Sequence, residues 1–312
     1  MLQSLGKFLP DDQPYGESWE VADCGNDSNL VQNGPQRGKN LRDLVQQFPR
    51  ELLGERAHEA TEFPILIKYL DANSWLSVQV HPDDAQSPNG VGKNEAWVIM
   101  KAAPGSSVFA GLKRGVTRTT LEQALSSNRL KDCLHEIPVS PGDCIHIPAG
   151  TVHAIGPGIV LAEVQQQSDW TYRLDDWGRG RELHIAEALS CIDFNRGPIH
   201  PAHPTFRAST DGVIEELVHG DYFAIDRCSH VAPFELHGGP SCRIMMVVHG
   251  RGRLFQSDGI FDLRPGSTVL VPAASQPAMC IPEREMTVLD VCPGVPSVVT
   301  VGSQGHNRLS RI

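Results

Sequence analysis

Four polar side chains in the first half of the chain are of the types that bind a divalent metal ion. Gln79 and His81 lie two residues apart in the strand-like segment 75–84, where leucine and valine alternate with polar residues. Side chains two apart on a strand share a face, so the amide and the imidazole are expected to lie side by side. Glu95 and His153 follow in two further strand-like segments. Two imidazoles, a carboxylate and an amide oxygen can bind a divalent ion and leave coordination positions open.

Each of these residues has a more ordinary interpretation when it is taken alone. A single histidine on a strand is usually a hydrogen-bonded structural residue, and Glu95 alone would be solvated at a sheet edge. Lys93 stands two residues before Glu95 and could be a solvated lysine that protects an exposed strand. The combination favours a site, because short strands ending in turns are typical of the mouth of a small barrel.

The segments that must position these side chains are mostly strand-like. Alternating or continuous apolar patterns predict strands at 18–22, 63–70, 75–84, 92–100, 146–153 and 158–164. Helices are predicted at 41–48 after the capping residue Asn40, at 51–60, from Thr119 or Thr120 through Leu134, and at 182–191. The helices therefore read as short insertions between strands. The short acidic runs, Asp83–Asp84 and Asp175–Asp176, are expected to be solvated loops.

One strand-and-turn pattern occurs twice. Residues 141–154 and 265–278 both contain Pro-Gly, an apolar four-residue strand and Pro-Ala, 124 positions apart. Where the first copy has His153, the second has Pro277, which has no metal-binding atom. We expect a duplicated, mainly β architecture with the chemistry in the first copy.

A proline-rich segment divides the chain. Residues 195–204 contain three prolines, which is typical of a linker. The predicted division is a metal-binding domain at 1–195, a linker at 196–210 and a degenerate second domain at 211–312.

Composition narrows the class of protein. The chain has 312 residues, 40% of them hydrophobic and 21% charged, as in globular proteins that fold around a core. A net charge of −10 disfavours binding to nucleic acid or to an anionic membrane on electrostatic grounds.

Eight scattered cysteines without a CxxC motif favour free thiols in a reducing compartment. With no signal peptide and no long apolar segment, the expected location is the cytoplasm.

Several motifs, in order along the chain, resemble those of the mannose-6-phosphate isomerases, in particular the short bacterial zinc-dependent branch with a cupin fold. They are Gly-Glu-Ser-Trp-Glu at 16–20, Phe-Pro-Ile-Leu-Ile-Lys-Tyr-Leu-Asp-Ala at 63–72, Leu-Ser-Val-Gln-Val-His-Pro-Asp-Asp at 76–84, Gly-Lys-Asn-Glu-Ala-Trp at 92–97, Ile-Pro-Ala-Gly-Thr-Val-His-Ala at 147–154 and Ser-Asp-Trp-Thr-Tyr-Arg at 168–173. The resemblance is strong over residues 15–195, and beyond them it rests on length and strand pattern.

The resemblance implies a fold and a metal. The fold would be mainly β, with two cupin-like (jelly-roll) β-barrels and short helical insertions in the N-terminal half. One Zn²⁺ per chain would be held by Gln79, His81, Glu95 and His153, the same four residues that the strand pattern brings together. Other divalent metals share such ligands.

The resemblance also implies roles for residues around the metal. Arg173 and Lys93 match active-site cations of the family, and Glu163 matches a carboxylate proposed to move the proton. From the residues alone, a structural salt bridge between Glu163 and Arg173 is the competing interpretation. Lys68, Lys93 and Arg173 are the candidates for binding phosphate.

The implied activity is the interconversion of mannose 6-phosphate and fructose 6-phosphate, by proton transfer through an enediol-type intermediate. The partner would be a small-molecule sugar phosphate, and the protein would be a monomer or a homodimer. Two alternatives fit the same residue types. One is a cupin oxygenase that holds Fe(II) with two histidines and a carboxylate, and the other is a non-catalytic cupin that binds a sugar phosphate.

Overall fold

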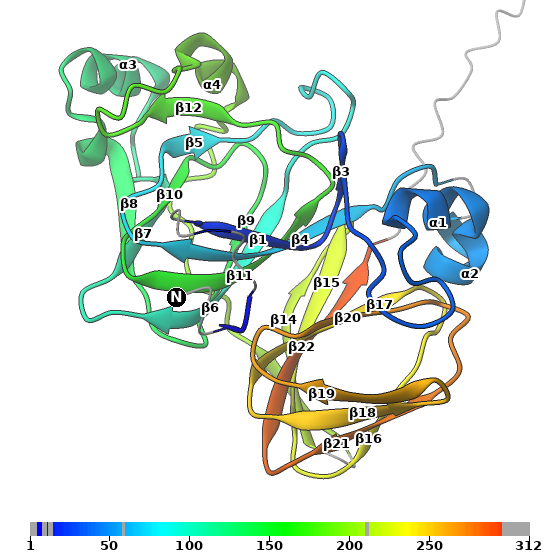
Figure 1. Ribbon diagram of the computed structural model, residues 1–312. Coiled ribbons are helices and arrows are strands. Elements are labelled where there is room, and N and C mark those ends of the chain that lie inside the picture. The colour runs from blue at the N-terminus through cyan, green and yellow to red at the C-terminus, as the bar shows by residue number, and fades with distance from the viewer. Residues whose placement is uncertain (1–4, 8–10, 12–14, 58–59, 210–211, 295–312) are drawn as a thin grey trace, which may run out of the picture.

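The computed structural model describes residues 5–7, 11, 15–57, 60–209 and 212–294. Among these residues the protein is mainly β-sheet with a few short helices, as the sequence predicts (Figure 1). All strand pairs are antiparallel. None of the helices in the described part of the chain is both long and apolar enough to cross a membrane.

The N-terminal half contains two five-stranded sheets whose inner faces pack together. The first has the order β1 (Glu17–Val21), β4 (Ile65–Ala72), β11 (Ile159–Gln166), β6 (Glu95–Ala102) and β9 (Cys144–Ile147). The second has the order β12 (Tyr172–Asp175), β5 (Val78–Val80), β10 (His153–Ile155), β7 (Ser107–Leu112) and β8 (Leu134–Pro138). Buried residues of both sheets, such as Trp97 and Leu161 of the first and Val108 and Ile155 of the second, form one apolar cluster.

The C-terminal half has the same plan. One sheet has the order β13 (Thr205–Ser209), β14 (Gly212–His219), β15 (Phe223–His230), β22 (Met286–Pro293), β17 (Arg243–His249) and β20 (Thr268–Val271). The other has the order β16 (Phe234–Leu236), β21 (Ala278–Pro282), β18 (Gly252–Gln256) and β19 (Gly259–Leu263).

The strand orders of the two halves correspond. The order β4-β11-β6-β9 matches β15-β22-β17-β20, and β5-β10-β7-β8 matches β16-β21-β18-β19. The two copies of the Pro-Gly pattern become β9 and β20, which lie at the ends of the corresponding sheets β1-β4-β11-β6-β9 and β13-β14-β15-β22-β17-β20. Among the described residues, hydrogen bonds do not close either pair of sheets into a continuous barrel.

The remaining elements are short. They are the hairpin β2 (Asp23–Cys24) and β3 (Asp27–Ser28), the helices α1 (Leu41–Gln47), α2 (Pro49–Leu53), α3 (Arg118–Ser126) and α4 (Ile185–Cys191), and the 3₁₀ turns η2 (Glu55–Ala57) and η3 (Leu130–Cys133). The side chain of Asn40 accepts a hydrogen bond from the Asp43 amide and caps α1, as predicted. The predicted helix 51–60 is divided between α2 and η2, and its residues 58–59 lie outside the described part of the chain.

The helix predicted from Thr119 or Thr120 to Leu134 differs from the structure at both ends. Its N-cap is Thr117, which accepts a hydrogen bond from the Thr120 amide. It ends at Ser126, because Asn128 takes a left-handed conformation (φ 55°) that stops the helix.

Two strand predictions near the candidate site were too long. The segment 75–84 forms only the three-residue β5, and His81 lies just beyond its end. The segment 146–153 is divided between β9 and β10, which belong to different sheets. Between them Gly150 has a φ of 80°, a conformation that favours glycine, and its amide donates to the His81 carbonyl. This turn carries the chain across from one sheet to the other.

Candidate functional site

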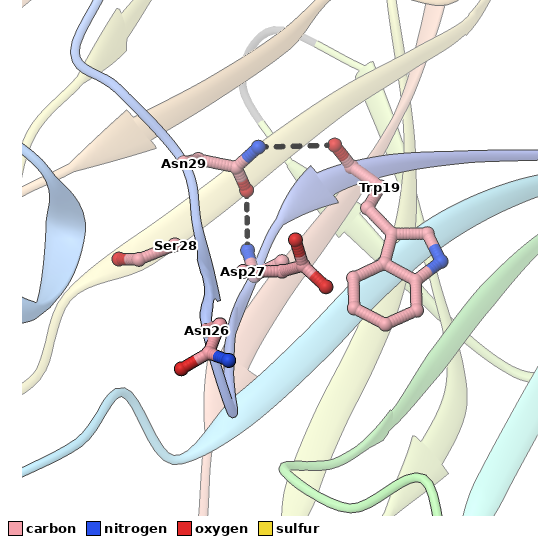
Figure 2. Close-up of a pocket in the computed structure, with 6 residues that line it drawn as sticks. Trp19, Asn26, Asp27, Ser28 and Asn29 are labelled. Atoms are coloured by element: carbon pink, nitrogen blue, oxygen red, sulfur yellow. Dashed lines mark hydrogen bonds between the residues drawn. The ribbon is translucent and has the colours of Figure 1, made fainter.

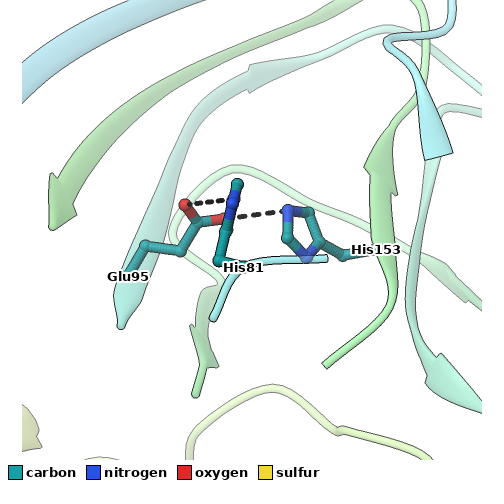
Figure 3. A group of neighbouring side chains, drawn as sticks. All are labelled: His81, Glu95 and His153. Carbon is teal, nitrogen blue, oxygen red and sulfur yellow. Dashed lines mark ion pairs between the residues drawn. The ribbon is translucent and has the colours of Figure 1, made fainter. Parts of the chain in front are cut away.

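His81, Glu95 and His153 form a compact group at one end of the N-terminal sheets (Figure 3). His81 follows β5, Glu95 is the first residue of β6, and His153 is the first residue of β10. The separate sheets thus present the carboxylate and the imidazoles toward one another. All three side chains are at least 98% buried.

The distances within this group are short enough for shared coordination of one ion. Nε2 of His81 lies 3.3 Å from Oε2 of Glu95, and Nε2 of His153 lies 3.2 Å from Oε1 of the same carboxylate. The candidate ligand atoms all lie within 4.8 Å of one another. These three residues are among the four that residue type and spacing grouped as candidate ligands.

Backbone contacts select which imidazole nitrogen faces the carboxylate. Nδ1 of His81 lies 2.8 Å from the Trp170 carbonyl oxygen, and Nδ1 of His153 lies 2.8 Å from that of Thr151. A carbonyl oxygen can only accept, so each Nδ1 carries the proton and each Nε2 presents a lone pair when the ring is neutral. Burial lowers the pKa of His153, and burial followed by the Lys93 charge lowers the pKa of His81 to about 3. Both rings are therefore neutral near pH 7.

This arrangement fits a cation. Two imidazole lone pairs face the two oxygens of one carboxylate, and neither Glu95 oxygen has a hydrogen-bond partner among the described residues. Burial raises the pKa of Glu95, but the Lys93 charge opposes this and the pKa lies below its usual range. Buried lone pairs at these distances repel one another unless positive charge lies between them.

Gln79 lies beside the same group. It is paired in register with His153 on β10, and its Nε2 lies 3.2 Å from His153 Nε2. Its Oε1 instead accepts from the Ser77 hydroxyl at 3.1 Å. The amide nitrogen, and not the expected oxygen, thus faces His153, and a half-turn of the amide would exchange the two atoms.

Lys93 is buried rather than solvated. Its side chain is 6% exposed, and Nζ lies 3.4 Å from Oε2 of Glu95. The alternative of a lysine protecting an exposed strand is therefore wrong. The buried cation places a fixed positive charge beside the three ligand candidates.

Glu163 lies in the middle of β11, on the inner face of its sheet. Oε1 accepts a hydrogen bond from Nε1 of Trp97 at 2.9 Å, and Oε2 lies 3.6 Å from Nζ of Lys68. Its buried ionic partner is thus Lys68, and not Arg173 as the competing interpretation supposed. Burial and then the nearby charge of Glu95 raise the pKa of Glu163, despite Lys68.

Lys68 lies between the Glu163 carboxylate and residues of β1. Its Nζ lies 3.5 Å from Oε2 of Glu17 and 4.9 Å from the centre of the Trp19 ring. Burial lowers the pKa of Lys68, but Glu163 and Glu17 outweigh burial and leave the pKa above its usual value. Lys68 is therefore charged at neutral pH.

Arg173 lies on β12, directly opposite Gln79 of β5. Paired residues of neighbouring strands share a face, so its side chain begins on the face that carries Gln79. One guanidinium nitrogen donates to the Glu182 carbonyl at 3.1 Å, while the buried Nε has no hydrogen-bond partner in the part of the chain that the structure describes.

Sequence reasoning missed two polar residues next to Glu163. Gln165 and Gln167 follow it at spacing two, which was the available signal, and both are at least 92% buried. Nε2 of Gln165 donates to the carbonyls of Gln166 and Ser168. Within the described ranges of the chain, Oε1 of Gln165 and both polar atoms of the Gln167 side chain have no hydrogen-bond partner.

Asp176 departs from expectation. It is buried rather than solvated, and its carboxylate accepts hydrogen bonds from Arg179 and Arg181. His146 pairs with Ala96 and stacks edge-on against Phe223 of the C-terminal half. His146 therefore points away from the metal-site group.

A shallow hollow of about 370 Å³ lies at the outer end of β1 (Figure 2). It is lined by Trp19, Ala22 and residues 26–29 of the β2–β3 hairpin. Trp19, which lines the hollow, is also the ring that contacts Lys68. Burial raises the pKa of Cys24, a residue of this hairpin, and the negative charge of Asp169 raises it further. The hairpin therefore lies near the segment that follows β11.

Comparison with known proteins finds related sequences and structures. Residues 1–123 match the family model for the catalytic domain of type I phosphomannose isomerase. A mannose-6-phosphate isomerase of Streptococcus mutans is 32% identical over 281 residues, covering 87% of each chain. The crystal structure of the Bacillus subtilis mannose 6-phosphate isomerase covers 93% of each chain, with a TM-score of 0.84 and 28% identity. A mannose 6-phosphate isomerase structure bound with zinc and yttrium shares the fold, with a TM-score of 0.70 at 18% identity. The chain belongs to the mannose-6-phosphate isomerase family.

Proposed function

We infer that this protein interconverts mannose 6-phosphate and fructose 6-phosphate. The observation that carries the inference is the convergence of His81, Glu95 and His153, with Gln79 beside them, in a chain of this family. The reaction moves a proton between two neighbouring carbons and needs a proton carrier and stabilisation of charge on two oxygens.

We propose that Gln79, His81, Glu95 and His153 hold one zinc ion. Support comes from the two neutral imidazoles, each with an unprotonated Nε2 turned toward Glu95, and from the ionised carboxylate between them. A bound zinc ion would act as a Lewis acid on the substrate oxygens.

Glu163 is the proposed proton carrier. Its carboxylate is held in place by the Trp97 indole, and its raised pKa moves it toward neutral pH, where an acid–base group works best. It would take the proton from one carbon and return it to the other. Lys68 would limit the rise in pKa and keep the carboxylate ionised in the resting protein.

Lys68, Lys93 and Arg173 are the proposed binding groups for the phosphate and the developing negative charge. Local cations are needed because the whole chain carries a net charge of −10. Arg173 keeps its charge at any working pH, and its buried Nε has no hydrogen-bond partner within the described chain. We propose that it contacts the substrate.

We also propose that each pair of sheets is a cupin-like barrel derived from one duplicated unit, in the division 1–195, 196–210 and 211–312. The matching strand orders support the duplication. A cytoplasmic location remains part of the proposal, supported by the eight free cysteines.

The test is an isomerase assay on the purified protein combined with elemental analysis. We expect one zinc per chain, loss of activity after chelation, and recovery when zinc is added back. Full activity in protein shown to be metal-free would contradict the proposal. Oxygen consumption coupled to product formation would instead indicate the oxygenase alternative.

A further inference from the structure

The loop between the proposed ligands His81 and Glu95 is held in place by hydrogen bonds to the carboxylate of Asp84. The chain leaves the site at His81 and returns to it at Glu95, so residues 82–94 form a loop with a ligand at each end. Oδ1 of Asp84 accepts from the Gly92 amide at 2.7 Å, which closes this loop near its base. A Cβ atom at Gly92 would lie 2.6 Å from the Asp83 carbonyl carbon, so the two sides of the loop are in close contact.

The same carboxylate is connected to the segments that carry the other ligands. Nε2 of Gln166 donates to Oδ1 of Asp84 at 3.0 Å, and Oε1 of Gln166 accepts from the backbone and side-chain nitrogens of Asn94 at 2.9 and 2.7 Å. Oδ1 of Asn94 in turn accepts from the Ala149 amide at 3.0 Å. Asn94 directly precedes Glu95, and Ala149 lies in the turn that leads to His153.

The remaining oxygen of Asp84 is bound by the C-terminal half. The hydroxyl of Tyr222 donates to Oδ2 of Asp84 at 2.7 Å, and Tyr222 directly precedes β15. Burial and the hydrogen bond to Asp84 raise the pKa of Tyr222 to about 12, so the hydroxyl keeps its proton at working pH. Burial raises the pKa of Asp84, but the hydrogen bonds from Gly92, Tyr222 and Gln166 outweigh it and lower the pKa.

We propose that Tyr222 is a positioning residue through which the C-terminal half holds the metal-site loop in place. The route runs from the Tyr222 hydroxyl through Asp84 to Gly92, and through Gln166 and Asn94 to Glu95. This assigns the second half of the chain, which lacks a counterpart of His153, a contribution to the site. The proposal rests on the metal binding put forward above.

The test compares two variants that each remove one contact between the halves. Tyr222→Phe keeps the ring and removes the hydroxyl. Arg227→Met is the matched control, because an Arg227 guanidinium nitrogen donates to the Gly142 carbonyl at 2.5 Å, across the same boundary but away from the loop. For each zinc-loaded protein we would measure the rate of zinc loss to an excess of chromogenic chelator, together with kcat and KM.

We expect Tyr222→Phe to lose zinc on the order of 10-fold faster and to have a lower kcat, the range seen when groups that orient metal ligands are removed. Arg227→Met should lower the melting temperature with zinc loss unchanged. Asp84→Asn should speed zinc loss as well, and combining it with Tyr222→Phe should add little, because both act through one hydrogen bond.

Unchanged zinc loss in Tyr222→Phe, or equal acceleration in Arg227→Met, would overturn the proposal. Zinc loss is measured without the isomerase reaction. A wild-type protein that binds zinc but does not turn over sugar phosphate would therefore refute the proposed activity and leave the role of Tyr222 to be decided by the chelator experiment.

Discussion

The chemistry of the site depends on which atom each residue presents. Hydrogen bonds from Nδ1 to the backbone carbonyls of Trp170 and Thr151 turn the Nε2 lone pairs of His81 and His153 toward Glu95. An imidazole whose second nitrogen is fixed in this way is oriented for a metal before the metal arrives. The group is therefore preorganised by ordinary backbone contacts.

Replacing one proposed ligand should remove the metal. We expect His153→Ala to lose zinc and to have isomerase activity reduced at least 100-fold, because a ligand and its orientation are both lost. Pro277→Ala is the control, since the exposed Pro277 occupies the equivalent position of the second copy. Zinc per chain, measured by elemental analysis, distinguishes the variants, and normal zinc content in His153→Ala would exclude it as a ligand.

Glu163→Gln should separate proton transfer from metal binding. The amide oxygen can still accept from Trp97, but the side chain can no longer carry a proton. We expect kcat to fall roughly 10²–10⁴-fold with zinc content unchanged. Steady-state kinetics and elemental analysis check both parts, and a kcat close to that of the wild type would make Glu163 a structural partner of Lys68.

At the scale of elements, most of the site residues lie on strands, and loops and turns position the rest. The strand β5 has three residues, and His81, Lys93 and the turn before His153 all lie outside strands. Residues outside regular ladders depend on side-chain hydrogen bonds for their position. The short acidic runs supply two such anchors, Asp84 in the loop after His81 and Asp176 after β12.

Asp176 gives stability that depends on pH. Hydrogen bonds from Arg181, opposed by burial and supported by Arg179, lower its pKa. A carboxyl group with a lowered folded pKa stabilises the fold fully above its unfolded value of about 4, and this contribution is lost as the pH falls toward the folded value. Asp176→Asn should therefore lower the free energy of unfolding at pH 7 by roughly 1–2 kcal/mol, and by less at pH 3. Urea denaturation at both values tests this, and an equal loss at each would contradict it.

At the scale of the whole molecule, the two halves share a core. The outer face of the β4–β11–β6 sheet, with Ile67 and Val164, lies in one buried cluster with Ile225 and Leu289 of the C-terminal half. Helices α1 and α2 extend the same cluster, and the Ala273 amide donates to the Leu52 carbonyl. The linker near residue 200 thus divides the sequence into two parts, but the buried apolar core is continuous between them.

A shared core predicts cooperative unfolding. We expect calorimetry to show a single transition, because separating the halves would expose the buried apolar cluster to water. A ligand present at 1,000 times its Kd stabilises the folded state by about 4 kcal/mol. Removing zinc with a chelator should therefore move this transition to lower temperature without splitting it. Two transitions, of which zinc shifts one alone, would show that the halves unfold independently.

Much of the fold and of the candidate site was predictable, and the errors have physical causes. Apolar patterns indicated β1, β4, β6 and β11, and capping indicated α1, because these signals are local. The strand predicted at 146–153 was wrong, since Gly150 turns the chain between sheets. Asp176 was expected to be solvated, and solvation was the ordinary alternative to an active-site role for Lys93, because a single sequence shows charge but not the partner that permits burial.

The sequence by itself determined the mainly β character, the repeated strand pattern and the set of side chains able to bind a metal, because residue type and spacing along one strand express them. Tertiary structure decided that His81, Glu95 and His153 meet, that Lys68 and not Arg173 pairs with Glu163, and that Tyr222 contacts Asp84. These contacts join residues far apart in the chain, and their distances depend on how whole sheets pack. No local pattern contains that information.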